Sequence, residues 1–187
     1  MKKLSILIIV IVAIAVIAVG WYISTRNGLV RLDETINQAW SEVDNQLQRR
    51  SDLIPNFVNT VKGYAAHEEK VFTDIADARS RLIGAKTVEE KADGYNGMQS
   101  ALSRLLVIAE QYPDLKANTN FVALQDELAG TENRIAVARK RYNDSVGSFN
   151  IRIRSFPASI IAGNMGFTAR VYFEINEAAR QVPQVNF

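Results

Sequence analysis

Few residues of this chain have the types and spacing that catalysis or metal binding needs. The 187 residues include no cysteine and a single histidine, His67. Thiol nucleophiles, thiolate metal sites and disulfide bonds are therefore excluded, and a site built from several histidines of one chain is not expected. The sequence also lacks the P-loop, the dinucleotide-binding glycine motif, the H-E-x-x-H zinc motif and the G-x-S-x-G nucleophile motif. We therefore predict that the protein is not an enzyme, and a carboxylate site without a known motif is the catalytic alternative.

The nearest approach to a cluster of metal ligands is the run His67-Glu68-Glu69. Neighbouring side chains on a helix point about 100° apart, so three consecutive residues cannot surround one metal ion. We interpret the run as the start of a helix, whose dipole favours acidic residues in the first turn. No metal and no other cofactor is expected. A charged group further along the chain is interpreted as a solvated face with short-range pairs: Asp74, Asp77 and Arg79.

Arg50 and Pro55 interrupt an otherwise apolar helical stripe over residues 29–64. Proline has no amide hydrogen, so the carbonyl oxygen of Ser51 loses its helical donor, at a cost of about 3 kcal/mol in an unrelieved helix. We expect a kink between Arg50 and Pro55, with Ser51 or Asp52 satisfying the freed backbone groups. A half-buried arginine needs water or a partner for its charge. Arg50 is therefore expected to extend its charged end to solvent, or to pair with Asp52 or with an acid of a neighbouring helix. The alternative is that the kink and the arginine together mark a contact site.

Basic residues are spread over the chain rather than gathered into one strong field. The chain has 22 basic and 20 acidic residues, a net charge of +2, which argues against a nucleic-acid partner. The one basic concentration comprises Arg134, Arg139, Lys140, Arg141, Arg152 and Arg154. Helical spacing distributes these residues over several sides, so we interpret them as a solvated face. Contact with anionic lipid headgroups is the alternative.

Two long runs repeat with a mean spacing of 3.5 residues, the heptad pattern of packed helices. The first run comprises Leu29, Leu32, Ile36, Trp40, Val43, Leu47, Arg50, Ile54, Phe57, Val61 and Tyr64. The second comprises Phe121, Leu124, Leu128, Thr131, Ile135, Ala138, Tyr142, Val146, Phe149, Ile153 and Phe156. The phenylalanines at these positions, and Tyr112 and Tyr142, are predicted to be core residues.

Two shorter helices are predicted between these runs, over about residues 68–83 and 88–111. Thr87, followed three residues later by Glu90, indicates a capping box at the start of the second of them. Residues 118–120 offer caps for the last long helix. Helix ends are expected at Gly84, before Pro113 and before Pro157. A further short helix is expected near residues 174–180.

The first residues have the composition of a membrane anchor. Residues 4–23 are twenty positions with one hydroxyl group, on Ser5, and no charge. As a helix this run is about 30 Å long, the thickness of the hydrocarbon core of a bilayer. Trp21 and Tyr22 stand at its end, where aromatic rings favour the headgroup level. A signal peptide cleaved near Gly20 is the alternative, but the apolar run continues past that site.

The sequence thus predicts an all-α protein: an N-terminal transmembrane helix followed by an elongated antiparallel four-helix bundle. The long first helix of the bundle is kinked and continues directly from the anchor. The expected organisation is a short tail of residues 1–3, an anchor of residues 4–23, a bundle of residues 24–157, and a C-terminal tail of residues 158–187 that packs on the bundle.

Groups of residues along essentially the whole chain resemble the LemA family. In the first half these are Trp40-Ser41, Gln46-Leu47, Arg49-Arg50, Asp52-Leu53-Ile54-Pro55-Asn56, Lys62-Gly63-Tyr64, His67-Glu68 and Ala78-Arg79. In the second half they are Glu110, Tyr112-Pro113, Leu115-Lys116-Ala117, Phe121, Leu124, Thr131-Glu132-Asn133-Arg134-Ile135, Ala138-Arg139, Tyr142-Asn143 and Phe156-Pro157. The chain departs from the family pattern at Arg26, where a tyrosine is usual.

The resemblance implies a bacterial single-pass membrane protein with a helical soluble domain and no established enzymatic activity. It also implies the genomic company of membrane metallopeptidases and other small membrane proteins. We single out six residues as structural or interaction residues: Trp40, Arg50, Asp52, Pro55, Glu132 and Arg134. The charges that flank the anchor are nearly balanced. They slightly favour an anchor in the inner membrane with its N-terminus on the cytoplasmic side and the bundle outside the cytoplasm.

Three classes of function remain. The favoured one is a membrane-anchored interaction or scaffold protein that acts through self-association and protein contacts, with membrane lipid as a further partner and no small-molecule substrate. The second is a membrane-shaping or membrane-organising homo-oligomeric assembly. The third is the enzyme with an unrecognised carboxylate site. Several apolar residues off the two heptad runs are expected to lie partly under another subunit of a homo-oligomer larger than a dimer: Leu53, Val58, Phe72, Ile83 and Leu105.

Overall fold

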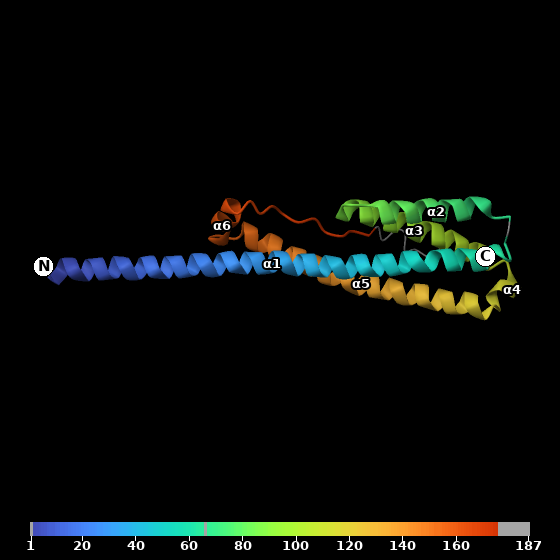
Figure 1. Ribbon diagram of the computed structural model, residues 1–187, viewed down its shortest axis with the longest axis horizontal. Coiled ribbons are helices and arrows are strands. Elements are labelled where there is room, and N and C mark those ends of the chain that lie inside the picture. Colours follow the sequence, from blue (N-terminus) through green and yellow to red (C-terminus); the bar gives the residue numbers. More distant parts are fainter. Residues whose placement is uncertain (1, 66, 176–187) are drawn as a thin grey trace, which may run out of the picture. The chain divides into compact units, whose positions relative to one another are not determined.

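Six α-helices and no strand make up residues 2–65 and 67–175, the part of the chain that the computed structural model describes (Figure 1). The helices are α1 (Lys2–Lys62), α2 (Glu69–Gly84), α3 (Val88–Ala109), α4 (Pro113–Lys116), α5 (Thr119–Arg154) and α6 (Ala158–Asn164). The predicted all-α fold is confirmed. The four longer helices begin and end within a few residues of their predicted bounds, because heptad spacing and caps are local signals.

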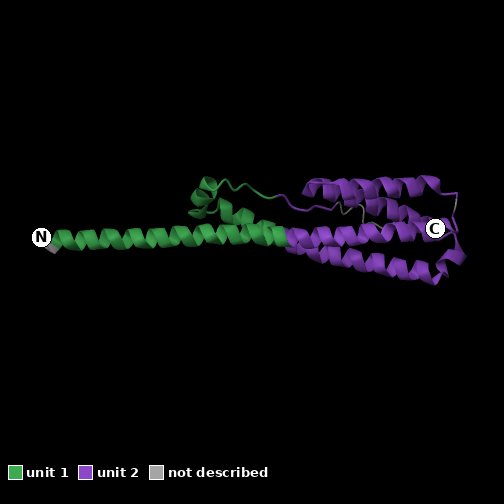
Figure 2. Ribbon diagram, in the orientation of Figure 1, with its two compact units in different colours: residues 1–38, 144–170 green, residues 39–143, 171–187 purple. Residues whose placement is uncertain are grey.

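The chain divides into two compact units (Figure 2). Unit 1 consists of residues 1–38 and 144–170, and unit 2 consists of residues 39–143 and 171–187. Both α1 and α5 contribute to each unit. The predicted organisation, with a tail of residues 1–3, an anchor of residues 4–23, a bundle of residues 24–157 and a tail of residues 158–187, stays a prediction.

In unit 1, α1 is exposed along its apolar N-terminal part. Its described side chains are exposed from Lys3 to Ser24, and the window long and apolar enough to cross a membrane has no buried residue. Burial begins at Thr25 and returns at Leu29 and Ile36. Beside this part of α1 lie the end of α5 and α6 (Figure 2). The expected continuation of the soluble helix from the anchor is confirmed, because α1 is one helix of 61 residues.

Arg170 holds unit 1 together at a polar junction. Its guanidinium Nη2 lies 2.7 Å from Oδ1 of Asp33 in α1. Its backbone N–H donates to Oδ1 of Asn150 in α5 at 2.8 Å, and Asn150 Nδ2 donates back to the carbonyl of Arg170 at 2.8 Å. The junction therefore fixes which turns of α1 and α5 stand at the same level.

In unit 2, α1 and α5 run antiparallel. Phe57 stacks on Phe121 with ring centroids 5.3 Å apart, and Trp40 packs on Tyr142 at 5.2 Å. Residue numbers thus increase along α1 while the numbers of the contacted residues of α5 decrease, as expected for antiparallel helices. Helices α2 and α3 cover this pair, and their apolar faces complete the core with Phe72, Ile75, Leu82, Tyr95, Met98 and Leu105.

The segment that follows α6 has no helix in its described part, and from residue 171 it belongs to unit 2. Asn143 holds it by accepting from the backbone N–H of Phe173 at 2.9 Å and donating to its carbonyl at 3.2 Å. The hydroxyl of Tyr142 donates to the carbonyl of Val171 at 2.8 Å. The Phe173 side chain is fully buried, with Trp40 and Tyr95 as ring neighbours. Val171 and Phe173 therefore hold this segment against the helices of unit 2, and residues 176–187 of the expected tail lie outside the described residues.

Several local predictions need correction. The short helices α4 and α6 were not predicted, because segments of four and seven residues are too short to show a period. Of the helix expected near residues 174–180, residues 174 and 175 are not helical and the rest lie outside the described residues. Phe156, predicted as core, is 82% exposed, because the helix ends at Arg154 and the heptad register ends with it.

Fewer of the five apolar residues off the heptad runs are exposed than predicted. Phe72 and Leu105 are buried within unit 2, and Leu53 and Val58 are half-buried. Among these five residues only Ile83 is exposed, at 41%. Helices α2 and α3 cover most of the set themselves, so it no longer argues for a subunit contact.

Candidate functional site

The most deeply placed charge described in unit 2 is Arg50, and its side chain is 5% exposed. Its Nη1 donates to the carbonyl of Leu128 at 3.0 Å and lies 2.9 Å from Oε2 of Glu132. Its Nη2 donates to Oε1 of Gln99 at 2.7 Å. Nη1 also lies 3.5 Å from Oγ1 of Thr131, so the guanidinium of α1 binds one group of α3 and three groups of α5. This confirms the prediction that an acid of a neighbouring helix, one of its two expected partners, pairs with Arg50.

Glu132 is the counter-ion of this centre and is itself held in place. The hydroxyl of Tyr95 in α3 donates to Oε2 of Glu132, the same oxygen that faces Arg50. The centre of the guanidinium also lies over the Tyr95 ring, 5.8 Å from its centroid, within reach of a cation–π contact. The buried pair is therefore fixed in direction as well as neutralised, which is how a buried ion pair specifies helix register.

A cavity of about 210 Å³ adjoins this centre. It is lined by Arg50, Phe57, Gln99, Leu102, Ser103, Leu106, Gln125, Leu128, Ala129 and Glu132. Arg50 Nε is buried without a hydrogen-bond partner among the described residues. Glu132 is the one carboxylate of the lining. The contacts of Arg50 join α1 to α3 and α5.

A second, exposed ion pair network lies beside the first. Glu127 of α5 accepts from Arg49 Nη2 at 2.7 Å and from Arg134 Nη2 at 3.0 Å. The hydrogen bond from Arg49, with the nearby positive charges of both arginines, holds the pKa of Glu127 below its ordinary value of 4.5. Arg134, singled out from the sequence, thus pairs within its own helix rather than with another element.

Pro55 frees the carbonyl oxygen of Ser51, as predicted, but a different residue satisfies it. Arg79 of α2 donates from Nε to this oxygen at 2.9 Å. Asp52, predicted as the local partner, lies 3.9 Å from Nη2 of the same arginine and accepts from Gln48 at 2.8 Å. Helix α1 continues through Pro55 without interruption, and the predicted kink stays a prediction. Arg79, interpreted from the sequence as part of a solvated face, instead joins two helices.

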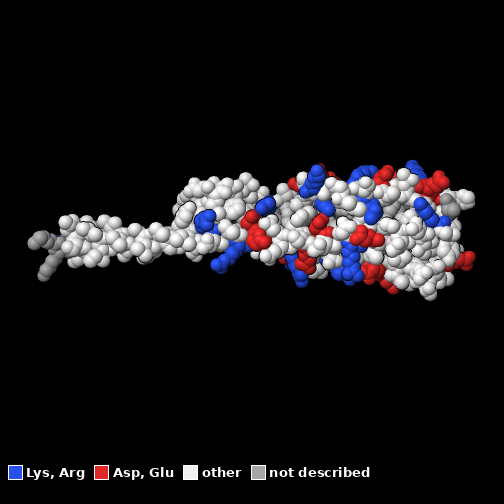
Figure 3. Space-filling view, in the orientation of Figure 1, with Lys and Arg blue, Asp and Glu red and all other residues white. Residues whose placement is uncertain are grey.

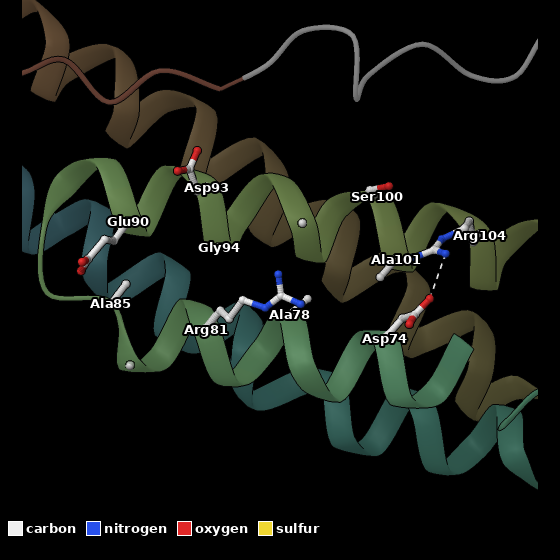
Figure 4. A pocket seen from close by; sticks show the side chains of 12 residues that line it. Asp74, Ala78, Arg81, Ala85, Glu90, Asp93, Gly94, Ser100, Ala101 and Arg104 are labelled. Carbon is white, nitrogen blue, oxygen red and sulfur yellow. Dashed lines mark ion pairs between the residues drawn. The ribbon is translucent and has the colours of Figure 1, made fainter. Parts of the chain in front are cut away.

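Unit 2 also has an open groove between α2 and α3, with a volume of about 650 Å³ (Figure 4). It is lined by Asp74, Ala78, Arg81, Gly84, Ala85, Glu90, Asp93, Gly94, Gly97, Ser100, Ala101 and Arg104. Figure 4 shows the Arg81 side chain lying between the two helices, and Asp74 pairing with Arg104 at 2.9 Å across it. The two helices approach closely at Gly94, where an added Cβ atom would lie 2.8 Å from Cα of Leu82.

Two carboxylates of the groove, those of Asp74 and Glu90, are engaged in structural contacts. Glu90 accepts from the backbone N–H groups of Lys86 and Thr87 at 2.7 and 3.2 Å, and Thr87 accepts from Glu90 N at 3.1 Å. The predicted capping box is thus confirmed, and these backbone hydrogen bonds lower the pKa of Glu90. Among the described residues no three His, Cys, Asp or Glu side chains are grouped closely enough to hold a metal ion.

Both signs of charge alternate over the surface that Figure 3 shows, without a large area of one sign. Trp40, the remaining residue singled out, packs on Tyr142 and Phe173 and is a structural residue. The sequence did not indicate Gln99 or Tyr95 as partners of the Arg50 centre. Both lie on α3, and only the packing of α3 against α1 and α5 brings them there.

Comparisons with known proteins point to one family. A family model described as LemA family matches residues 39–187. Magnetosome protein MamQ 2 of Paramagnetospirillum magneticum is 26% identical, over 88% of this chain and 71% of its own length. Magnetosome protein MamQ of Magnetospirillum gryphiswaldense is 27% identical over 86% and 70%, and protein LemA of Metamycoplasma hominis is 25% identical over 85% and 73%. None of these names denotes an enzyme. With the exposed apolar part of α1, the likeness supports a membrane-anchored protein.

Proposed function

The chain belongs to the LemA family, and on that premise we propose that it is a membrane-anchored interaction or scaffold protein. It acts through self-association and through contacts with other proteins at the bacterial membrane. Membrane metallopeptidases and other small membrane proteins are the proposed hetero-partners.

One observation carries this proposal: the charged groove between α2 and α3 of unit 2 is open to the outside, while the buried Arg50 centre joins helices. Arg50, the deepest charge, is engaged by α3 and α5. The groove between α2 and α3 is open and carries both signs of charge, including Arg81 and Asp93. Such a surface suits a protein partner with complementary charges better than a small substrate, which needs an enclosed and mostly apolar site.

The proposal is tested by the mass of the full chain in mild detergent, measured by size-exclusion chromatography with light scattering. We expect a particle larger than a dimer. Reversing two charges of the groove, Arg81→Glu with Asp93→Lys, is expected to reduce the mass. The matched control reverses two charges on α5, Asp126→Lys with Arg139→Glu, and is expected to leave the mass unchanged. A wild-type monomer, together with no protein captured by a membrane-wide cross-linking experiment, contradicts the proposal.

We further propose that α1 crosses the bacterial inner membrane once, with the N-terminus in the cytoplasm and the helical units outside. The nearly balanced flanking charges support this orientation only slightly, and long soluble segments can be translocated regardless of charge. Protease added to intact spheroplasts is expected to cleave the helical units. Protection of these units in intact spheroplasts, with cleavage after lysis, would show the opposite orientation.

The alternative function is a membrane-organising homo-oligomeric assembly. The likeness to two proteins named for the magnetosome favours it. This alternative predicts that the purified full chain changes the curvature of vesicles in electron micrographs. A scaffold that only recruits partners leaves the vesicle diameters unchanged.

A further inference from the structure

Unit 1 exposes large apolar side chains where α5 ends and α6 begins. Phe156 is 82% exposed, Ile151 is 64% exposed and Ile160 is 59% exposed. The opposite faces of the same helices are buried, with Phe149, Ile153 and Ile161 in the core of the unit. Phe156 is the most exposed of the large apolar side chains in the described part of the chain. Three exposed large apolar side chains within ten residues of the sequence indicate a surface that is covered in the working protein.

The level of this surface along α1 follows from the Arg170 junction. Arg170 joins Asp33 of α1 to Asn150 of α5. From Asn150 to Arg154, where α5 ends, is four residues, about 6 Å along the helix, and from Asp33 back to Ile23 is ten residues, about 15 Å. Since the helices are antiparallel, the end of α5 stands about 9 Å from the level at which the apolar part of α1 ends. The headgroup layer on one side of a bilayer is roughly 5–7 Å thick, and consecutive Cα atoms are about 3.8 Å apart, so Phe156, two residues after Arg154, is within reach of this layer.

Burial along α1 agrees with this placement. Thr25 is the first buried side chain of the described part of α1, two residues after Ile23. The end of α5 and α6 therefore begin to cover α1 just where its lipid-exposed part stops (Figure 1). Trp21 and Tyr22, 43% and 42% exposed, stand in the same headgroup layer.

The charge of this part of unit 1 suits anionic lipid. Residues 24–32 of α1 contain Arg26 and Arg31, and residues 145–169 contain Arg152 and Arg154. Neither stretch contains an aspartate or glutamate, and all four arginines are exposed. Basic residues next to a membrane-spanning helix are attracted by the negative surface of anionic lipids. The same charges repel an identical surface of a second copy, so lipid is the occupant that fits.

We propose that this surface, defined by Arg152, Arg154, Phe156 and Ile160 and here called the α5–α6 corner, is a second membrane contact. It lies in the headgroup layer of the bilayer that α1 crosses, with Phe156 and Ile160 reaching toward the acyl chains and the two arginines binding anionic headgroups. The contact fixes the tilt of unit 1 against the membrane. It depends on the anchor but not on the proposed scaffold function.

The absence of cysteine allows a direct test, because a single introduced cysteine carries a unique nitroxide label. Ser155→Cys places the label in the corner, and Ser148→Cys is the matched control on an exposed turn of the same helix, about 10 Å away. The full chain is reconstituted in vesicles of phosphatidylcholine and phosphatidylglycerol. Collision of each label with a water-soluble nickel chelate is then measured by electron paramagnetic resonance.

We expect the label at position 155 to collide with the chelate roughly threefold less often than the label at position 148, because the headgroup layer excludes the chelate. Adding Phe156→Ser and Ile160→Ser is expected to remove this difference, with the helical content unchanged because both side chains are exposed. Equal collision rates at the two positions overturn the proposal. So does protection that persists in the serine variant, because protein rather than lipid then covers the corner.

The same samples show whether a second copy of the chain, rather than lipid, covers the corner. Diluting labelled protein with unlabelled protein leaves the spectrum unchanged if the corner faces lipid. Spectral broadening at position 155 that disappears on dilution would assign the corner to a contact between copies and overturn the membrane contact.

Discussion

The Nε of Arg79 donates to the carbonyl oxygen of Ser51 at 2.9 Å, and this oxygen is the one that Pro55 leaves without a helical donor. An arginine of α2 thus completes the hydrogen bonding of α1. The arrangement explains how a proline is accommodated inside a helix that continues to Lys62. It also ties the position of α2 to one turn of α1.

This relationship predicts that the effect of substituting Arg79 on stability depends on the presence of Pro55. Arg79→Met is expected to lower the free energy of unfolding by about 1–2 kcal/mol, because a part-buried carbonyl loses its donor. In a Pro55→Ala background the alanine N–H restores the helical bond, so the same substitution is expected to cost less. The four proteins are compared as full chains in detergent by chemical denaturation followed by circular dichroism. Equal costs in both backgrounds would contradict the assignment.

The Arg50 centre is predicted to be the most sensitive ionic contact of unit 2. Arg50→Met is expected to cost about 3 kcal/mol or more, because it leaves the carboxylate of Glu132 partly buried without its counter-ion. Arg50→Met combined with Glu132→Gln is expected to cost less than the sum of the single changes. The control is Arg49→Met, whose side chain is 59% exposed and whose loss is expected to cost about 0.2–1 kcal/mol. Comparable costs at positions 49 and 50, measured by denaturation, would argue against a buried centre.

Gly94 is predicted to be required for the contact between α2 and α3. A Cβ atom at this position would lie 2.8 Å from Cα of Leu82, so Gly94→Ala must push the two helices apart. We expect a loss of about 1–3 kcal/mol from overpacking. Gly97 on the same helix is the matched control, because its Cβ would meet nothing closer than Ala78 at 4.0 Å. Gly97→Ala is expected to be neutral or to stabilise α3 by up to about 1 kcal/mol. The idea fails if the two alanine variants melt at the same temperature.

Glu127 is predicted to titrate below its ordinary pKa of 4.5, because Arg49 and Arg134 stabilise its charged form. Since the pKa is lower in the folded than in the unfolded chain, these contacts stabilise the fold above the unfolded pKa. That contribution is lost as the pH falls through the lower, folded pKa. Carbon NMR of labelled glutamate side chains should place the midpoint of Glu127 below 4.5, and Arg49→Met should raise it. A midpoint that does not respond to this substitution would show that Arg49 is not the cause.

Local patterns in the sequence predicted the helices well. Twenty uncharged positions predicted the anchor, heptad spacing predicted the long helices, and Thr87 with Glu90 predicted a capping box. These features depend on residues three to seven positions apart, so their physical cause lies within one helix. The presence of a partner for Arg50 followed in the same way, because a buried charge must be neutralised.

The identity of the partners was decided by tertiary structure alone. Heptad spacing says that Arg50 faces other helices, but the packing of α3 and α5 selects Gln99 and Glu132. The donor to Ser51 comes from Arg79, 28 residues away, because the chain reverses between α1 and α2. The prediction that Phe156 is a core residue was wrong. The heptad spacing of the sequence continues to Phe156, but the helix ends before it, at Arg154. A helical period records which face of a helix is apolar, whereas the neighbour that covers this face depends on how separate helices pack.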